Sequence, residues 1–135
     1  MSKYVVTGGA GFIGSNIVTR LVLEGEKVTV LDNLSEGKIE NLTPVMDKIT
    51  FIEGDIRNGK DLDKALNGAR FVLHQAALRS VPKSMTLPLE YNDVNVSGTL
   101  ALLMKAKEHG IKRVVFCIFQ LCLRRQGCLS GKRRR

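Results

Sequence analysis

Short apolar stretches rich in β-branched residues alternate with longer amphipathic stretches along the first 117 residues of the chain. Short apolar runs bounded by turn residues are typical of strands buried in a parallel sheet. On this pattern we expect five strands, at residues 3–7, 28–31, 48–52, 69–73 and 114–117.

The segments between these runs have the spacing of helices. Apolar residues recur at helical intervals from Phe12 until Gly25, which is a plausible helix stop. A short helix is expected at 61–66, and the polar stretch 33–43 is expected to be a loop that leads into a short helix. Two prolines predict an extended loop over 80–88.

A long amphipathic helix is predicted at 91–109, followed by Gly110. Its inner side is expected to carry Val94, Val96, Leu100, Leu103 and Met104. Strands that alternate with helices imply a parallel sheet with right-handed crossovers. The predicted fold class is therefore α/β: a Rossmann-like parallel sheet of order 3-2-1-4-5 with flanking helices, incomplete after strand five. Its ligand is expected at the switch point between strands one and four.

A glycine-rich turn links the first strand to the first helix, with the sequence Thr7-Gly8-Gly9-Ala10-Gly11-Phe12-Ile13-Gly14. In this context Gly8 permits a sharp turn, Gly11 allows a pyrophosphate to approach the backbone, and Gly14 lets the helix pack closely on the sheet. Free N–H groups near Phe12 and Ile13 would then face the phosphates. The alternative is a tight turn that holds no ligand.

Two carboxylates end neighbouring strands. Asp32 follows the second strand, where it could accept hydrogen bonds from the adenosine ribose and repel a 2′-phosphate, which favours NAD over NADP. The alternative is an ordinary acid at a strand end. Asp55 and Ile56 follow the third strand; they could contact adenine, although an Asp that caps a turn is almost as plausible.

The net charge of +8 is uneven. Residues 1–117 carry 15 Lys/Arg and 13 Asp/Glu, whereas residues 118–135 carry six Lys/Arg and no acid. Such a short basic run is more typical of a solvated, disordered end than of a specific nucleic-acid site. No apolar stretch is long enough to span a membrane, and no secretory signal is evident, so a cytoplasmic location is expected. The three cysteines lack the paired spacing of a zinc site, and no metal is expected.

Five motifs carry a resemblance to a known family. They are Thr7–Gly14, Leu31-Asp32-Asn33-Leu34, Gly54-Asp55-Ile56-Arg57, His74-Gln75-Ala76-Ala77 and Asn95-Val96-Ser97-Gly98-Thr99. In this order and spacing, residues 1–117 resemble the extended short-chain dehydrogenase/reductases, and within them the NAD-dependent nucleotide-sugar epimerases and dehydratases. The string Ser80-Val81-Pro82-Lys83-Ser84 is most similar to the UDP-glucose and UDP-N-acetylglucosamine 4-epimerases.

The resemblance implies a cofactor, NAD, and a set of contacts to it. Phe12 and Ile13 would bind pyrophosphate, residues 32–37 the adenosine ribose, and Asp55 and Ile56 the adenine. Residues 75–79 would line the middle and nicotinamide side, Asn95 would brace the site, and Ser80 is a weaker candidate for sugar contact. The cofactor-binding set is Gly8, Gly11, Phe12, Ile13, Gly14, Asp32, Asn33, Leu34, Ser35, Gly37, Asp55, Ile56, Gln75, Ala76, Ala77, Arg79 and Asn95.

The resemblance also implies a reaction and partners. The family oxidises a UDP-hexose transiently at C4, with a Tyr as base and a Lys that lowers the pKa of this Tyr, and homodimers are expected for it. In this chain the two tyrosines are Tyr4 and Tyr91, and neither is followed four residues later by Lys. No catalytic residue is therefore assigned, no substrate domain is expected, and the chain alone is expected to be inactive.

The tail departs from the family after Phe116. Codons permitted for residues 117–126, read one base later, would encode Ala-Ser-Ser-Ser-Ser-Val-Tyr-Gly-Asp, which is like the segment the family carries there. We therefore expect a truncated or frameshifted chain, with an NAD-binding part over 1–117 and a basic tail over 118–135. The alternatives are a non-catalytic NAD-binding or redox-sensing module and, less favoured, a protein that interacts through its basic tail.

Overall fold

A computed structural model describes residues 2–117, and the expected basic tail, with Cys122 and Cys128, lies outside the described residues. The described chain forms one five-stranded sheet of order β3-β2-β1-β4-β5, in which every pair is parallel. The strands are β1 (Lys3–Thr7), β2 (Lys27–Asp32), β3 (Ile49–Glu53), β4 (Phe71–His74) and β5 (Arg113–Phe116). The predicted fold class and strand order are confirmed.

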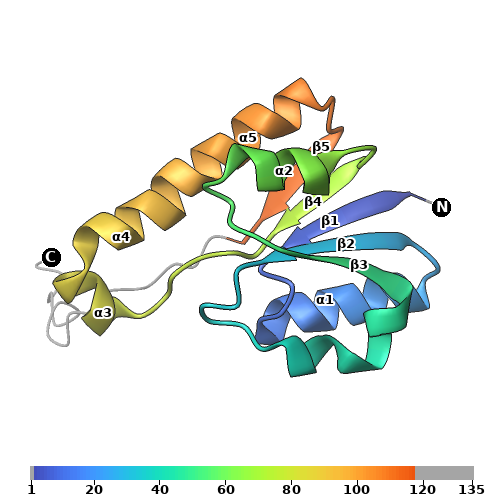
Figure 1. Cartoon of the computed structure of the whole chain (residues 1–135), viewed down its shortest axis with the longest axis horizontal. Helices are drawn as coiled ribbons and strands as arrows, with labels where there is room; N and C mark the ends of the chain where they lie inside the picture. The colour runs from blue at the N-terminus through green and yellow to red at the C-terminus, as the bar shows by residue number, and fades with distance from the viewer. Residues whose placement is uncertain (1, 118–135) are drawn as a thin grey trace, which may run out of the picture.

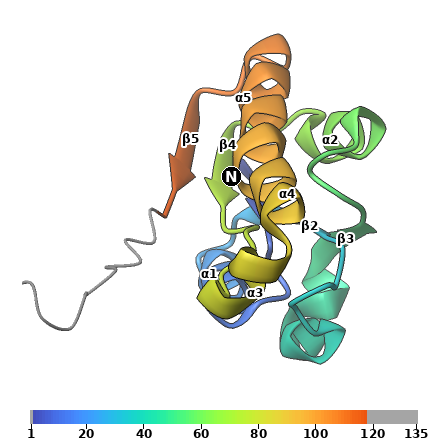
Figure 2. The ribbon, with the colours of Figure 1, turned by 90° about the vertical axis from the view of Figure 1, so that its left-hand side faces the viewer.

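Helices cover both faces of the sheet (Figure 1). On one face lie α1 (Phe12–Leu23) and the 3-10 helix η1 (Ile39–Lys48), and on the other lie α2 (Gly59–Leu66) and α5 (Thr99–Glu108). Figure 2 shows β5 at the edge of the sheet away from β3. This arrangement follows from the crossovers, because β1 to β3 connect on one side and β3 to β5 on the other.

Each face of the sheet buries its own apolar cluster. Val5 of β1 packs with Leu62 and Leu102 under α2 and α5, whereas Val6 packs with Val18 and Leu42 under α1 and η1. All these side chains are fully buried. Consecutive side chains of a strand point to opposite faces, so the apolar run of β1 serves both clusters at once.

The segment predicted as an extended loop over 80–88 is instead helical, and that prediction was wrong. It contains α3 (Val81–Thr86), and Pro88 then begins α4 (Pro88–Asn92). The Ser80 hydroxyl accepts a hydrogen bond from the Lys83 N–H at 3.4 Å and caps α3. Both prolines lie in a first turn, where the missing N–H costs no helical hydrogen bond, so they start helices here rather than prevent them.

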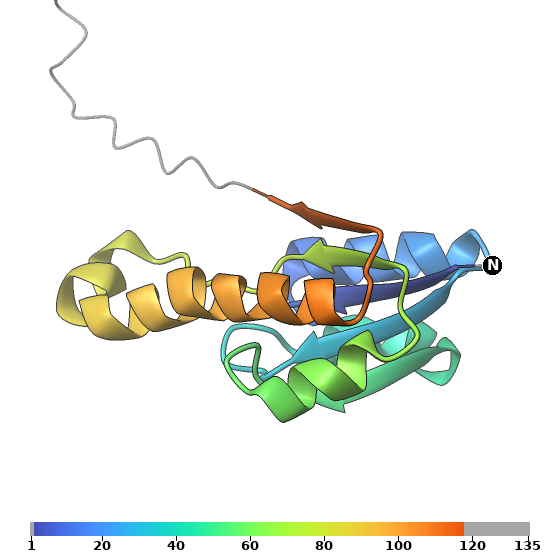
Figure 3. The same ribbon diagram turned by 90° about the horizontal axis from the view of Figure 1, so that it is seen from above.

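The long helical segment predicted at 91–109 is present, but its inner face differs from the prediction. A π-helical stretch, η2 (Asp93–Gly98), joins α4 to α5 in one continuous rod that projects beyond the sheet (Figure 3). The buried positions are Val94, Gly98, Leu102 and Ala106, at a constant spacing of four residues.

Of the five predicted inner residues, Val94 is buried, and the other four were placed wrongly. Val96, Leu100, Leu103 and Met104 are 60%, 57%, 38% and 59% exposed. A spacing of four residues would drift around an ideal α-helix of 3.6 residues per turn, and the wider π turn compensates for this drift.

Two neighbouring leucines test this register. Leu102 is fully buried and Leu103 is 38% exposed. Leu102→Ala should lower the free energy of unfolding by about 2–5 kcal/mol through loss of burial and a residual cavity. Leu103→Ala should lower it by about 1 kcal/mol or less. Urea denaturation followed by circular dichroism measures both variants. Equal losses, or a larger loss for Leu103→Ala, would contradict the observed register.

Candidate functional site

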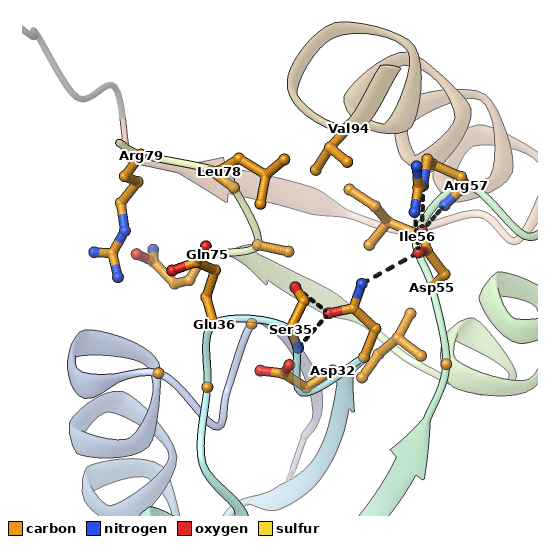
Figure 4. A pocket seen from close by; sticks show the side chains of 18 of the residues that line it. Asp32, Ser35, Glu36, Asp55, Ile56, Arg57, Gln75, Leu78, Arg79 and Val94 are labelled. Carbon is orange, nitrogen blue, oxygen red and sulfur yellow. Dashed lines mark hydrogen bonds and ion pairs between the residues drawn. The ribbon is translucent and has the colours of Figure 1, made fainter. Parts of the chain in front are cut away.

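The carboxyl ends of β1, β2, β3 and β4 meet the loops that follow them around one cleft (Figure 4). Twelve of the residues predicted for cofactor binding line this cleft. They are Gly8, Gly11, Asp32, Asn33, Ser35, Gly37, Asp55, Ile56, Gln75, Ala76, Ala77 and Arg79. The sheet thus brings together side chains from four separate stretches of the sequence at its topological switch point, where α/β proteins bind ligands.

The glycine-rich turn between β1 and α1 forms the floor of the cleft. Gly8 has a φ of +67°, and a Cβ there would lie 2.6 Å from the backbone nitrogen of Ala76. A Cβ at Gly14 would lie 2.2 Å from the Gly8 carbonyl oxygen. Packing of the protein itself therefore requires glycine at both positions.

Gly11 differs from these two glycines. Its φ of −73° and ψ of 172° are open to any residue, and a Cβ there would meet a single atom of residues 2–117 within 4 Å, the Gly8 carbonyl oxygen at 3.3 Å. A shift of a few tenths of an ångström would relieve this contact, so the fold requires glycine here much less strictly than at Gly8 and Gly14. The space in front of Gly11 opens into the cleft, which is where a close approach of a ligand would need it.

Helix α1 points the start of its backbone at this space. Its N-cap is Gly11, which provides no side-chain hydrogen bond, and its first turn carries no acidic residue. The first amide bonded within the helix is that of Ser15, which donates to the Gly11 carbonyl at 2.9 Å. The N–H groups of Phe12 and Ile13 precede it and are left for a partner outside the helix. Such a helix start attracts anions.

Asp32 lies at the end of β2, is 7% exposed and lines the cleft. One carboxylate oxygen accepts the Ala10 N–H at 2.9 Å, and the other accepts the Leu34 N–H at 2.8 Å. These bonds hold the carboxylate in place against the glycine-rich turn. Each oxygen can accept two hydrogen bonds, so each retains capacity for a ligand hydroxyl.

The loop after β2 packs directly on the glycine-rich turn. The Lys38 N–H and the Asn41 side-chain amide donate to the Ala10 carbonyl at 3.0 and 2.8 Å. A Cβ at Gly37 would lie 2.8 Å from the Ala10 carbonyl carbon. Gly37 therefore permits close packing between the two loops that border the cleft.

Asp55 belongs to an ionic network at the opposite end of the cleft. Its carboxylate accepts the Arg57 N–H at 2.8 Å, the Arg57 guanidinium at 2.7 Å and the Asn33 amide at 3.2 Å. Hydrogen bonding to Arg57 holds the pKa of Asp55 at about 2, despite partial burial that opposes this shift. Arg57 also pairs with Asp93 of η2 at 3.0 Å. The turn-capping role left open by the sequence is thus observed.

Residues 75–79, which we call the wall segment, follow β4 and line the cleft on their way to α3. The wall segment also lines a second, neighbouring hollow, together with His74, Asn95, Thr99, Phe116 and Cys117. The Asn95 side chain accepts the Leu78 N–H at 2.8 Å and donates to the Leu78 carbonyl at 2.9 Å. Asn95 therefore lies behind the wall segment and fixes its backbone.

Six predicted residues do not line the main cleft. Gly14 packs under the turn, and Leu34 adopts a φ of 59° and packs on the cluster beneath α1. Phe12 and Ile13 direct their side chains to an apolar surface of α1, and only their backbone lies at the helix start. Asn95 borders the second hollow, and Ser80 caps α3.

Glu36 and Leu78 also line the cleft, inside the ranges 32–37 and 75–79 that were predicted as a whole, whereas the sequence analysis missed five lining residues: Leu31, Gly54, Arg57, Glu90 and Val94. Gly54 and Arg57 flank the predicted pair Asp55 and Ile56, so extension of that loop by one residue on each side would have found them. Glu90 and Val94 come from the helical segment that was predicted with a different start and face. Within residues 2–117 no three His, Cys, Asp or Glu side chains cluster as metal ligands, and no helix there has the length and apolarity to cross a membrane.

Comparison with known proteins places this cleft in a family. The sequence profile of the NAD dependent epimerase/dehydratase family matches residues 4–118. A UDP-glucose 4-epimerase of Klebsiella pneumoniae is 40% identical over 121 residues, which cover 84% of this chain and 86% of that sequence. Solved structures of the family include NAD-bound proteins.

Two of these structures are similar over the described fold. The UDP-glucose-4-epimerase of Stenotrophomonas maltophila with bound NAD and formylated UDP-arabinopyranose is 33% identical, with a TM-score of 0.80 over 86% of this chain and 36% of that one. The UDP-N-acetylglucosamine 4-epimerase of Methanobrevibacter ruminantium, in complex with UDP-N-acetylmuramic acid, is 46% identical, with a TM-score of 0.78 over 85% and 37%. This chain therefore spans little more than a third of either structure.

The family match covers most of the chain, and the strand order, the glycine-rich turn and the acid at the end of β2 all agree with it. The predicted resemblance and the prediction of NAD as the cofactor of the family are confirmed. The chain belongs to the NAD-dependent epimerase/dehydratase family.

Proposed function

We propose that this chain binds NAD in the cleft at the carboxyl edge of the sheet. The observation that carries the proposal is the pairing of a helix start that has no side-chain cap with the cleft that Gly11 lines. The diphosphate would accept hydrogen bonds from the Phe12 and Ile13 N–H groups, where the helix dipole favours an anion.

The adenosine half would extend from this point toward β3. Asp32 would accept hydrogen bonds from the ribose hydroxyls with the free capacity of its fixed carboxylate. Adenine would lie near Asp55 and Ile56, beneath the network of Arg57. Asn33, Ser35 and Gly37, which line this part of the cleft, would surround this half.

The nicotinamide half would lie along the wall segment of residues 75–79. Bound NAD would supply a hydride acceptor for transient oxidation of a UDP-hexose at C4. Support comes from relatives whose structures hold NAD or UDP-sugars. Neither Tyr4 nor Tyr91 is followed four residues later by Lys, so the chain alone would bind the cofactor without turnover.

The Gly11 position gives the sharpest test of the cofactor site. Gly11→Ala should change the free energy of unfolding by about 0.5 kcal/mol or less. It should weaken NAD binding at least tenfold, because the added Cβ occupies the path of the diphosphate. Isothermal titration calorimetry measures the affinity.

Gly8→Ala is the matched control for folding. It places an alanine at φ +67° and a Cβ 2.6 Å from the Ala76 nitrogen, so it should lower stability markedly. Unchanged NAD affinity in a folded Gly11→Ala variant would contradict the proposed position of the diphosphate.

The choice between NAD and NADP tests Asp32. A 2′-phosphate beside this carboxylate meets a like charge, and Glu36 in the same cleft adds a second one. Asp32→Asn should lower the ratio of NAD to NADP affinity about tenfold, which corresponds to about 1.4 kcal/mol. Glu53→Gln removes the same charge from the neighbouring strand end, in register with Asp32, and should leave the ratio unchanged. An equal effect of the two substitutions would indicate a general charge effect.

Turnover can be tested directly. The 135-residue chain with NAD and UDP-glucose should form no UDP-galactose above the level without protein, because no Tyr-x-x-x-Lys pair is available for proton transfer. Product separation by anion-exchange chromatography detects the epimer. Turnover at the rate of a full epimerase, run in parallel, would overturn the proposed inactivity.

A further inference from the structure

A chain of hydrogen bonds runs behind the wall segment, from β1 to the helical rod. The Thr7 hydroxyl lies 2.5 Å from Nδ1 of His74, and Nε2 of His74 lies 3.0 Å from the Thr99 hydroxyl. Thr99 in turn donates to the Asn95 carbonyl at 2.8 Å, and the Asn95 side chain holds both backbone groups of Leu78.

The donor and the acceptor of each hydrogen bond in this series follow from its two ends. The backbone carbonyl of Asn95 can only accept, so the Thr99 hydroxyl donates its hydrogen to this carbonyl. The Thr99 oxygen must then accept a hydrogen bond from Nε2–H of His74. At the other end, the Thr7 hydroxyl oxygen accepts the N–H groups of Gln75 and Ala76 at 3.2 and 3.3 Å, which leaves the hydroxyl hydrogen for Nδ1; the Thr7 backbone carbonyl shares the Gln75 N–H at 3.0 Å. Both ends assign the same neutral tautomer, with the proton on Nε2.

The surroundings of His74 agree with this tautomer. The residue is 7% exposed, and burial lowers the pKa of its imidazole to about 4. A neutral ring can accept at Nδ1 and donate at Nε2, whereas an imidazolium could not accept from Thr7.

These hydrogen bonds hold the backbone of the wall segment at two points. Thr7 holds its start through the Gln75 and Ala76 N–H groups, and Asn95 holds Leu78 further along. His74 connects the two points, because its ring forms hydrogen bonds with the Thr7 hydroxyl on one side and with the Thr99 hydroxyl on the other. The proposed site for the nicotinamide half lies along the same segment, which lines both hollows.

We propose that His74 is a positioning residue: its neutral ring, held between Thr7 and Thr99, fixes the wall segment and thereby sets the affinity for the nicotinamide half of the dinucleotide. This inference rests on the proposed NAD site. An ordinary buried histidine that only supports the core would affect stability, but not one half of the ligand more than the other.

The test compares two ligands that share the adenosine half. ADP carries this half and the diphosphate, whereas NAD adds the nicotinamide ribose. Calorimetric titration of the unaltered chain should give a tighter affinity for NAD than for ADP. His74→Phe keeps a planar ring but breaks both bonds, and should weaken NAD binding at least fivefold with less than a twofold change for ADP.

Two further variants separate positioning from folding. Thr99→Val removes the hydrogen bond to His74 at a half-buried position and should reproduce part of the NAD-specific loss of affinity. This variant keeps the test available if His74→Phe does not fold. Val72→Ala removes apolar bulk from the same strand at a fully buried core position, and should lower stability while it leaves the ratio of NAD to ADP affinity unchanged.

Long-range ¹H–¹⁵N NMR spectra of the imidazole give an independent readout. They should show His74 protonated at Nε2 and free at Nδ1 at pH 7. An Nδ1–H tautomer, an imidazolium, or equal losses of NAD and ADP affinity in both His74→Phe and Thr99→Val would overturn the inference. Equal affinity of the unaltered chain for NAD and ADP would overturn it too, with the proposed NAD site intact; binding of neither ligand would overturn the proposed function itself.

Discussion

The site depends on one close contact: the backbone of the glycine-rich turn lies directly against the backbone that follows β4. Because Gly8 has no Cβ, its backbone comes close to Gln75 and Ala76, and Gly14 lets α1 pack on the same turn. This contact sets the start of α1 beside the wall segment and opposite the fixed carboxylate of Asp32. The positive end of the α1 dipole, the Asp32 carboxylate and the wall segment therefore face the same cleft, and no long loop is needed to hold them there.

Much of this arrangement could be predicted from the sequence because local signals and tertiary packing agree. The buried strands are short apolar runs, and a glycine-rich turn between a strand and a helix has a known geometry. The strand order, the glycine-rich turn and Asp32 therefore followed from the pattern of residues, whereas residues 33–37 and 75–79 of the cleft were implied by the family resemblance. Asp32 was recognisable because it ends the second strand, where the parallel sheet must bring it next to the turn.

The remaining features depend on tertiary packing. The inner face of the helical rod could not be read from periodicity, because a π turn at 93–98 changes the number of residues per turn. Pro82 and Pro88 favour loops in general but lie here in the first turns of α3 and α4, of which only α3 has a side-chain cap, from Ser80. The partners of His74 come from β1 and α5, distant in sequence, so only the folded chain reveals their hydrogen bonds.

The central claim is that the start of α1 receives the diphosphate of NAD. Titration of the ¹⁵N-labelled chain with NAD, followed by backbone amide NMR shifts, tests it most directly. We expect the largest changes at the amides of Gly11, Phe12 and Ile13, with smaller changes along residues 32–37 and 75–79. Saturable changes confined to other surfaces, with these three amides unmoved, would contradict the account.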